Sequence, residues 1–108
     1  MRRQLVDQVL DRPVDGTRAD LAVGDQLVLR LDQQSGGGHL WELSAVPDCL
    51  EPDADRVEPV GSSLPGSAHT RVLGLRASRP GAGELVLALR RPWEDEPTDE
   101  RRIRIRVQ

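Results

Sequence analysis

An all-β fold is predicted by three features of this 108-residue sequence. The 10 glycines and 8 prolines are spread along the chain, which interrupts every candidate helix and favours short strands joined by turns. Several segments alternate apolar and polar residues with the two-residue period of a strand that has one buried face. With no Phe, no Tyr and 2 Trp, the core must be built from Leu, Val, Ala and a few Ile side chains.

Three strands are expected in the N-terminal part of the chain. The first lies near Leu5 to Leu10, and a short second strand covers residues 21–23, just before a turn at Gly24-Asp25. Over residues 27–31, three leucines alternate with a valine and an arginine, which places the leucines together on one buried face.

The middle of the chain combines one clear strand with a long acidic segment. In residues 40–45, Trp41 and Leu43 share the inward face of a strand, and a buried Trp41 would anchor the core. Residues 47–65 are acidic and rich in proline, so we expect them to be mostly loop, with a short edge strand at 57–60.

The C-terminal part has the clearest alternation. Apolar residues recur at every second position in residues 73–77 and 85–89, and the segment 79–83 turns the chain between them. We therefore expect these two strands to form a hairpin. In residues 102–107, isoleucines and a valine alternate with arginines, whose charges are expected to face solvent and to discourage pairing between sheet edges.

About seven strands follow from this pattern, the number expected of an immunoglobulin-like β-sandwich. We predict one such domain over residues 1–108, because the chain is short and shows no internal repeat. A net charge of −3 and the lack of Phe and Tyr for base stacking argue against a nucleic-acid partner, even though arginines line residues 101–106. No apolar run approaches the roughly 20 residues of a membrane helix, so we expect no membrane partner.

Enzyme chemistry finds no support in the sequence. Gly36-Gly37-Gly38 could cradle a phosphate, but the residues that follow alternate as a strand, whereas such a loop needs a helix N-terminus. Cys49 could act with His39 or His69 as nucleophile and base, yet the carboxylates around it disfavour the thiolate. Two histidines and one cysteine also lack zinc-ligand spacing, so we predict no catalytic residue, no metal and no cofactor.

The tripeptide Arg91-Pro92-Trp93 is the strongest candidate for a binding site. It ends a well-patterned strand and opens the acidic loop 94–100, so Trp93 is expected at a loop tip. An exposed Trp beside Arg at a rigid strand end is typical of a protein-binding hot spot, and Pro92 stiffens the backbone there. The alternative is that Trp93 folds back as a lid on the end of the sandwich.

These residues resemble the chagasin family of cysteine-peptidase inhibitors, inhibitor family I42. The resemblance covers most of the chain and rests on Leu21-Ala22-Val23-Gly24, on Gly38-His39-Leu40-Trp41 and above all on Arg91-Pro92-Trp93. It implies a small immunoglobulin-like domain that blocks papain-like peptidases reversibly and non-covalently, by occluding the catalytic cleft with three loops at one end of the sandwich. The chain would then be an inhibitor and not an enzyme.

The resemblance also implies three inhibitory loops, which match the family motifs to different degrees. The first loop is degenerate, because the stretch 34–39 keeps only the final glycine of the family's Asn-Pro-Thr-Thr-Gly motif and has a histidine where an aromatic residue follows. The middle loop keeps one glycine of Gly-x-Gly-Gly, and the third loop keeps Arg-Pro-Trp intact. The peptidase-binding residues so implied are Ser35, Gly36, Gly37, Gly38, His39, Gly66, Ser67, Ala68, His69, Arg91, Pro92 and Trp93.

The implied partner is a papain-like cysteine peptidase, bound by a monomer. Because only the third of the three loops is intact, the alternative is a non-inhibitory protein-binding or adaptor domain on the same scaffold. The start of the chain, Met1 to Asp7, contains no apolar signal segment and predicts a cytoplasmic protein. A leader removed from a longer precursor would instead predict a secreted or periplasmic one.

Overall fold

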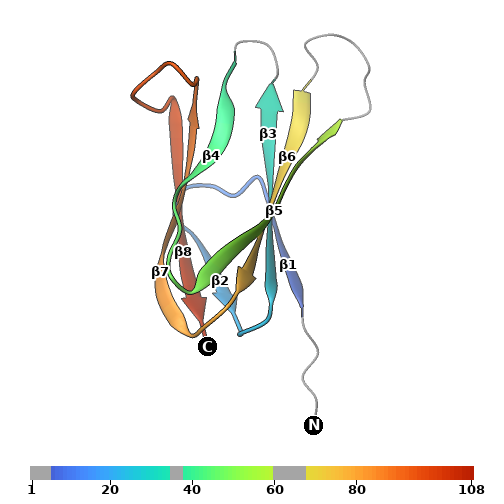
Figure 1. The fold of residues 1–108 in the computed structure, drawn as a ribbon, viewed down its shortest axis with the longest axis vertical. Coiled ribbons are helices and arrows are strands. Elements are labelled where there is room, and N and C mark those ends of the chain that lie inside the picture. Colours follow the sequence, from blue (N-terminus) through green and yellow to red (C-terminus); the bar gives the residue numbers. More distant parts are fainter. Residues whose placement is uncertain (1–5, 35–37, 60–67) are drawn as a thin grey trace.

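The computed structural model describes residues 6–34, 38–59 and 68–108, which form two packed four-stranded sheets (Figure 1). The strands are β1 (Asp7–Asp11), β2 (Thr17–Leu21), β3 (Gln26–Gln34), β4 (Leu40–Ala45), β5 (Leu50–Pro59), β6 (Ala68–Ala77), β7 (Gly81–Arg90) and β8 (Asp99–Val107). The strand order is β1-β3-β6-β5 in sheet A and β2-β8-β7-β4 in sheet B. The pairs β1–β3 and β2–β8 are parallel, and the remaining pairs are antiparallel. The predicted all-β sandwich is confirmed, with eight described strands in place of about seven.

The core lies between the two sheets and follows the alternation of the sequence. The leucines of β3 are fully buried, as are Leu85 and Leu87 of β7 on the opposite sheet. Trp41 is the largest buried side chain and keeps only 2% of its surface exposed, as predicted. Within the described residues, no helix is long and apolar enough to span a membrane.

The predicted hairpin between residues 73–77 and 85–89 is wrong. The two segments belong to β6 of sheet A and β7 of sheet B, so the turn between them carries the chain across the sandwich. At the end of β6, the amide of Ala77 donates to the carbonyl of Asp25, and the amide of Ser78 donates to that of Cys49. Alternation correctly placed both sets of apolar side chains in one core, but it does not distinguish a paired neighbour from a strand across that core.

Residues 47–65 were expected to be mostly loop, and the structure corrects this for the part it describes. Residues 50–59 form the ten-residue edge strand β5, paired along its length with β6 and interrupted by a register shift between Pro52 and Ala54. Almost none of its side chains is buried, so it lacks the alternation that marks a half-buried strand.

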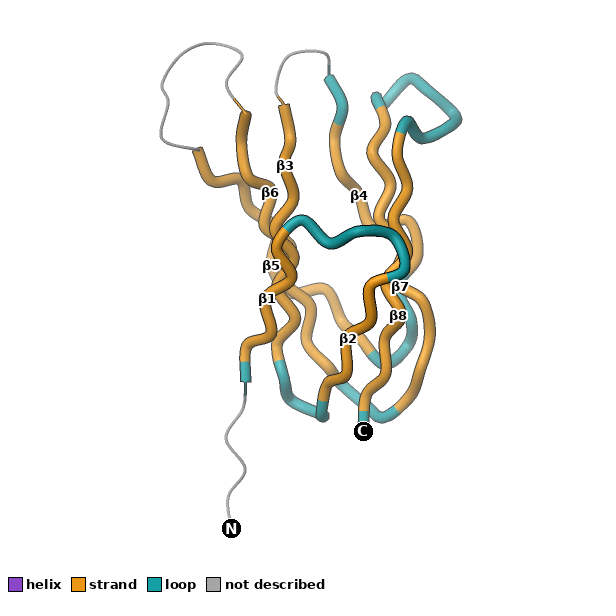
Figure 2. The backbone as a smooth tube through the Cα atoms, turned by 180° about the vertical axis from the view of Figure 1, so that it is seen from behind, coloured by secondary structure: helices purple, strands orange, loops and turns teal. Residues whose placement is uncertain are grey.

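Two further expectations about strand position are corrected. The second strand, expected at residues 21–23, lies earlier at Thr17–Leu21, and residues 22–25 form the turn. The alternating arginines of β8, at positions 102, 104 and 106, do face solvent. However, β8 pairs with β2 on one side and β7 on the other, so they do not guard a sheet edge. The segment between β1 and β2 crosses from one sheet to the other over the open side of the sandwich (Figure 2).

Candidate functional site

The candidate binding segments gather at one end of the sandwich, which we call the loop end. Strands β3, β5 and β7 end there, and β4, β6 and β8 begin there (Figure 1). Gly38 and His39 directly precede β4, residues 68–69 begin β6, and residues 91–93 follow β7. The predicted residues Ser35, Gly36, Gly37, Gly66 and Ser67 lie outside the described residues.

The third loop, residues 91–98, is held at both ends by backbone hydrogen bonds. The amide of Glu94 donates to the carbonyl of Arg91 over 3.0 Å, which closes a turn around Pro92 and Trp93. The amide of Thr98 donates to the carbonyl of Leu89 over 2.7 Å, which returns the chain to the sheet. Trp93 is 71% exposed, so the prediction of an exposed loop-tip residue is confirmed and the lid alternative is wrong.

The side chains of Arg90 and Arg91 stabilise this turn. Arg90 donates from Nε to Oε1 of Glu42 on β4, and from Nη1 to the carbonyl of Glu94 over 2.8 Å. The hydrogen bond to Glu42 raises the pKa of Arg90, because it stabilises the charged guanidinium. Arg91 places its guanidinium 5.9 Å from the centroid of the Trp93 ring, within cation–π range.

Sequence reasoning did not identify the Arg90–Glu42 brace. The two residues are distant in the sequence, and only the register of β4 against β7, which pairs Leu40 with Arg90, brings them together. The opposite charges of Glu42 and Arg90 could have indicated this ion pair, but only if the pairing of β4 with β7 had been known.

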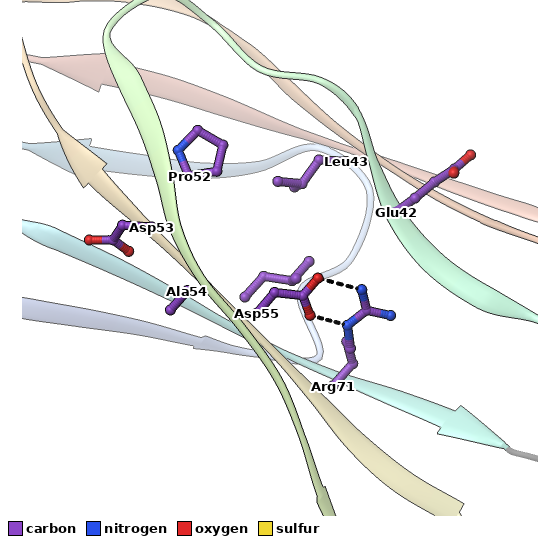
Figure 3. Close-up of a pocket in the computed structure, with 8 residues that line it drawn as sticks. Glu42, Leu43, Pro52, Asp53, Ala54, Asp55 and Arg71 are labelled. Carbon is purple, nitrogen blue, oxygen red and sulfur yellow. Dashed lines mark hydrogen bonds and ion pairs between the residues drawn. The ribbon is translucent and has the colours of Figure 1, made fainter.

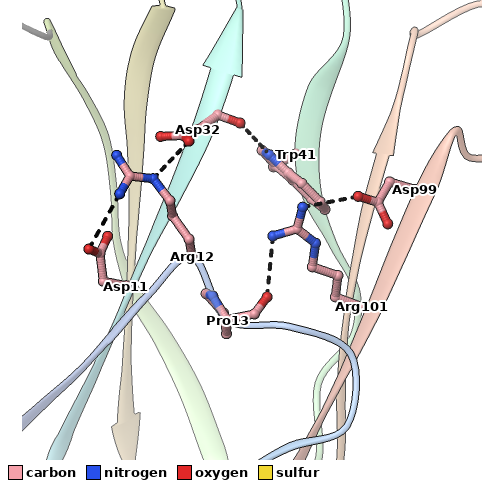
Figure 4. A network of polar contacts seen from close by, with 7 residues as sticks. All are labelled: Asp11, Arg12, Pro13, Asp32, Trp41, Asp99 and Arg101. Atoms are coloured by element: carbon pink, nitrogen blue, oxygen red, sulfur yellow. Dashed lines mark hydrogen bonds and ion pairs between the residues drawn. The ribbon is translucent and has the colours of Figure 1, made fainter.

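The stems of the first loop are joined across the two sheets by Trp41. Its backbone amide donates to Oε1 of Gln33 over 3.0 Å. Its indole Nε1 donates to the carbonyl of Asp32 over 2.8 Å (Figure 4). The guanidinium of Arg101 lies 4.7 Å from the centroid of the Trp41 ring and bonds Asp99. The end of β3 in sheet A is therefore fixed to the start of β4 in sheet B, and the first loop departs from a rigid base.

The side-chain amide of Gln33 is also connected to β6, which together with β5 flanks the middle loop of the three, called the second loop below. Oε1 of Gln33 accepts a second hydrogen bond, from Nη1 of Arg71 on β6 over 3.2 Å. Arg71 grips the carboxylate of Asp55 on β5 with two bonds of 2.5 and 2.7 Å, and this contact lowers the pKa of Asp55 (Figure 3). A cleft of about 510 Å³ opens beside this pair, with Leu43 of β4 on its other wall (Figure 3).

The described residues assemble no catalytic or metal-binding constellation. Cys49 is buried, 3% exposed, directly before the first residue of β5, and its carbonyl accepts from the amide of Ser78. No group of three or more His, Cys, Asp or Glu side chains in this part of the chain could hold a metal ion. What the loop end offers is therefore a braced surface for contact.

Comparison with solved structures finds the same architecture over nearly the whole chain. EhICP2, a cysteine protease inhibitor from Entamoeba histolytica, has a TM-score of 0.87 at 17% identity and covers 99% of this chain and 100% of its own. Amebosin has a TM-score of 0.75 at 19% identity, covering 98% and 100%. PbICP-C, solved in complex with falcipain-2, has a TM-score of 0.70 at 16% identity, covering 94% and 99%. These identities are low, so the likeness concerns the fold.

Sequence comparison adds the family. None of the curated proteins matches the chain. The model of the chagasin family of peptidase inhibitors, I42, matches residues 20–107, which contain every described strand except β1 and the first residues of β2. The chain therefore belongs to the chagasin family I42, whose members inhibit peptidases, and is not an enzyme.

Proposed function

We propose that this chain inhibits papain-like cysteine peptidases reversibly, by laying the loop end of the sandwich across the catalytic cleft. The observation that carries the proposal is Trp93, a large apolar side chain that is 71% exposed on a braced turn at the loop end. Exposed tryptophans held in rigid surroundings are typical anchors of protein–protein interfaces. The choice of cysteine peptidases is supported by the family and by EhICP2, a cysteine protease inhibitor of the same fold.

Inhibition of this kind needs no reactive group on the inhibitor. The third loop, Arg91 to Trp93, supplies buried aromatic area and a cation, and the first loop, Ser35 to His39, supplies backbone amides and carbonyls to the cleft. Residues 66–69, the middle loop, supply a further contact with the peptidase. The hydrogen bonds at Trp41 and Arg71 fix the strands that carry these loops, which reduces the ordering cost of binding.

Steady-state inhibition of papain tests this proposal, with trypsin as the serine-peptidase control. We expect inhibition of papain alone, and Trp93→Ala should weaken it about 30-fold or more, the loss expected of an interface hot spot. Val14→Ala is the matched control, because Val14 is 70% exposed but lies in the crossing segment between β1 and β2, away from the loop end. This variant should inhibit like the wild type.

Two outcomes would contradict the proposal in different ways. If the folded wild type leaves papain fully active at high micromolar concentration, the scaffold acts as a non-inhibitory binding domain towards this class of enzyme. If inhibition occurs but Trp93→Ala and Val14→Ala behave alike, the third loop lies outside the interface.

A further inference from the structure

The inference concerns how Trp93 is held, and it rests on the proposed function. Trp93 leaves most of its surface to solvent, and an exposed indole on a loop would ordinarily sample several rotamers. Arg91 lies over one part of the ring, and the turn from Arg91 to Glu94 fixes the backbone. Neither contact determines where the outer edge of the six-membered ring lies.

That edge packs on the first loop, at Gly38. A Cβ atom placed on Gly38 would lie 3.1 Å from Cη2 and 3.6 Å from Cζ3 of Trp93, the first of which is tighter than ordinary van der Waals contact. The indole therefore occupies the space that a side chain at position 38 would need. Gly38 also has a φ of +77°, a backbone conformation that residues with a side chain rarely adopt.

Gly38 lies close in the sequence to a fixed point of the fold. Three residues later the chain enters the core at Trp41, whose amide and indole bond Gln33 and the Asp32 carbonyl at the end of β3. The packing of Trp93 on Gly38 thus joins the third loop, from sheet B, to a point fixed by both sheets.

We propose that Gly38 is a positioning residue for inhibition: by lacking a side chain and adopting a left-handed backbone, it forms the seat that fixes the indole of Trp93 for the peptidase. Gly38 and the third loop then act as one surface and not as two independent contacts. A fixed indole loses less rotamer freedom on binding, which tightens the complex without any added contact. A direct contact between Gly38 and the peptidase is not required.

The first arm of the test uses the free protein and needs no peptidase. Gly38→Ala introduces a methyl group where the indole rests, and the exposed ring is free to move aside. Acrylamide quenching of tryptophan fluorescence reports on Trp93, because Trp41 is only 2% exposed. We expect the quenching constant to rise in Gly38→Ala; an unchanged constant overturns the seat.

The matched control is Gly16→Ala. Gly16 has a φ of +91°, so alanine there meets the same kind of backbone strain, but no atom lies within 4 Å of the added Cβ. Its quenching and its inhibition should match the wild type. Gly38→Asn is the second variant, because asparagine tolerates a left-handed backbone better than alanine does. It keeps the steric clash with Trp93 but reduces the backbone strain, so the two effects are separated. It should displace Trp93 as well, and thermal unfolding verifies that each variant is folded.

The second arm measures papain inhibition for the wild type, Gly38→Ala, Trp93→Ala and the double variant. Gly38→Ala should weaken inhibition about three- to tenfold, the cost of ordering one side chain on binding. In the Trp93→Ala background the same change should have no effect, because the residue it acts through is gone. An equal loss in both backgrounds overturns the proposal and assigns Gly38 a role of its own. A wild type that fails to inhibit refutes the proposed function, whereas the quenching arm still decides whether Gly38 seats Trp93.

Discussion

Strands β5 and β7 are both ten residues long, and both lead to a connection at the loop end, but they are held in the fold by different forces. Strand β7 lies inside sheet B and buries Leu85, Leu87 and Ala88. Strand β5 lies at the edge of sheet A, and of its residues 50–58, whose burial is described, only Leu50 is buried, while residues 51–58 are exposed or half-exposed. The same sandwich therefore supports one loop on an apolar strand and another on a polar one.

Charged and amide side chains take the place of burial along β5. Each of its carboxylates contacts a side chain of β6, the neighbouring strand, or of β3, the next strand in the sheet, and Glu58 also contacts Arg56 of β5 itself. The pairs are Glu51 with Arg76 at 2.7 Å, Asp53 with Gln26 at 2.7 Å, Asp55 with Arg71 at 2.5 Å and Glu58 with Arg30 at 3.4 Å. Exposed ion pairs are individually weak, so β5 is expected to be the less stable of the two strands and the one that responds to pH.

The largest expected difference between β7 and β5 is the loss in the free energy of unfolding when one apolar side chain is removed from each strand. Leu87→Ala deletes a fully buried side chain of β7 and should lower the free energy of unfolding by about 2–5 kcal/mol. Val57→Ala in β5 deletes a side chain that is 50% exposed, and should change it by about 0.5 kcal/mol or less. Urea denaturation of both variants gives the two values. Equal losses would mean that β5 depends on burial as much as β7 does.

The contrast explains which parts of the fold were predictable. Strand β7 was predicted because alternation reports burial of one face, and β7 has a buried face. Strand β5 was largely missed because its stability depends on partners in β3 and β6, which are identified only by the strand order and register. The hairpin error has the same origin, since alternation at residues 73–77 and 85–89 assigns a face but not a sheet.

The candidate site follows the same rule. The motif Arg91-Pro92-Trp93 lies within three consecutive residues, so its placement at an exposed turn could be predicted from the local sequence. The contacts that hold it join distant segments, as Arg90 joins Glu42 and Gly38 seats the ring of Trp93. Nothing in the local pattern of residues 36–39 indicates that one of three glycines packs against a tryptophan more than fifty residues later.

Gly74 provides a second test of the difference between β5 and β7. Strand β6 lies between β3 and β5, so the bond from Gln26 to Asp53 passes over it at Gly74. A Cβ on Gly74 would lie 3.0 Å from Nε2 of Gln26, 3.1 Å from Oδ1 of Asp53 and 3.0 Å from the Cβ of Ala54. Gly74→Ala should therefore destabilise the protein by about 1–3 kcal/mol, with the loss concentrated in β5.

Amide hydrogen exchange locates this effect. Protection in β5 should fall in Gly74→Ala while protection in β7 stays close to the wild-type value. The loss of stability should be smaller when Gln26→Ala is already present, since one of the three obstructing groups is then absent. A uniform loss of protection over both sheets would contradict the idea that this glycine serves the polar edge strand.

The smallest expected effect is the pH dependence of the Asp55–Arg71 pair. The bond to Arg71 lowers the pKa of Asp55 in the folded state below the value of about 3.9 expected in the unfolded chain. Asp55 therefore stabilises the fold fully above that pH, and the stabilisation disappears as the pH falls through the lowered folded-state pKa. The side chain of Asp55 is 55% exposed, so the contribution at neutral pH should be about 1 kcal/mol or less.

Comparing the wild type with Asp55→Asn across pH isolates this contribution from that of the other carboxylates. The difference in the free energy of unfolding should be constant from pH 7 down to about 4 and should shrink below it. Asp20→Asn, at an exposed position of β2 in the other sheet, is the matched control for the loss of one exposed carboxylate. If the difference in the free energy of unfolding between the wild type and Asp55→Asn does not shrink in acid, the charges of Asp55 and Arg71 add little to the stability of the fold. The charge of Asp55 would then add little to the backbone pairing that holds β5 on β6, and acid would not loosen this strand through Asp55.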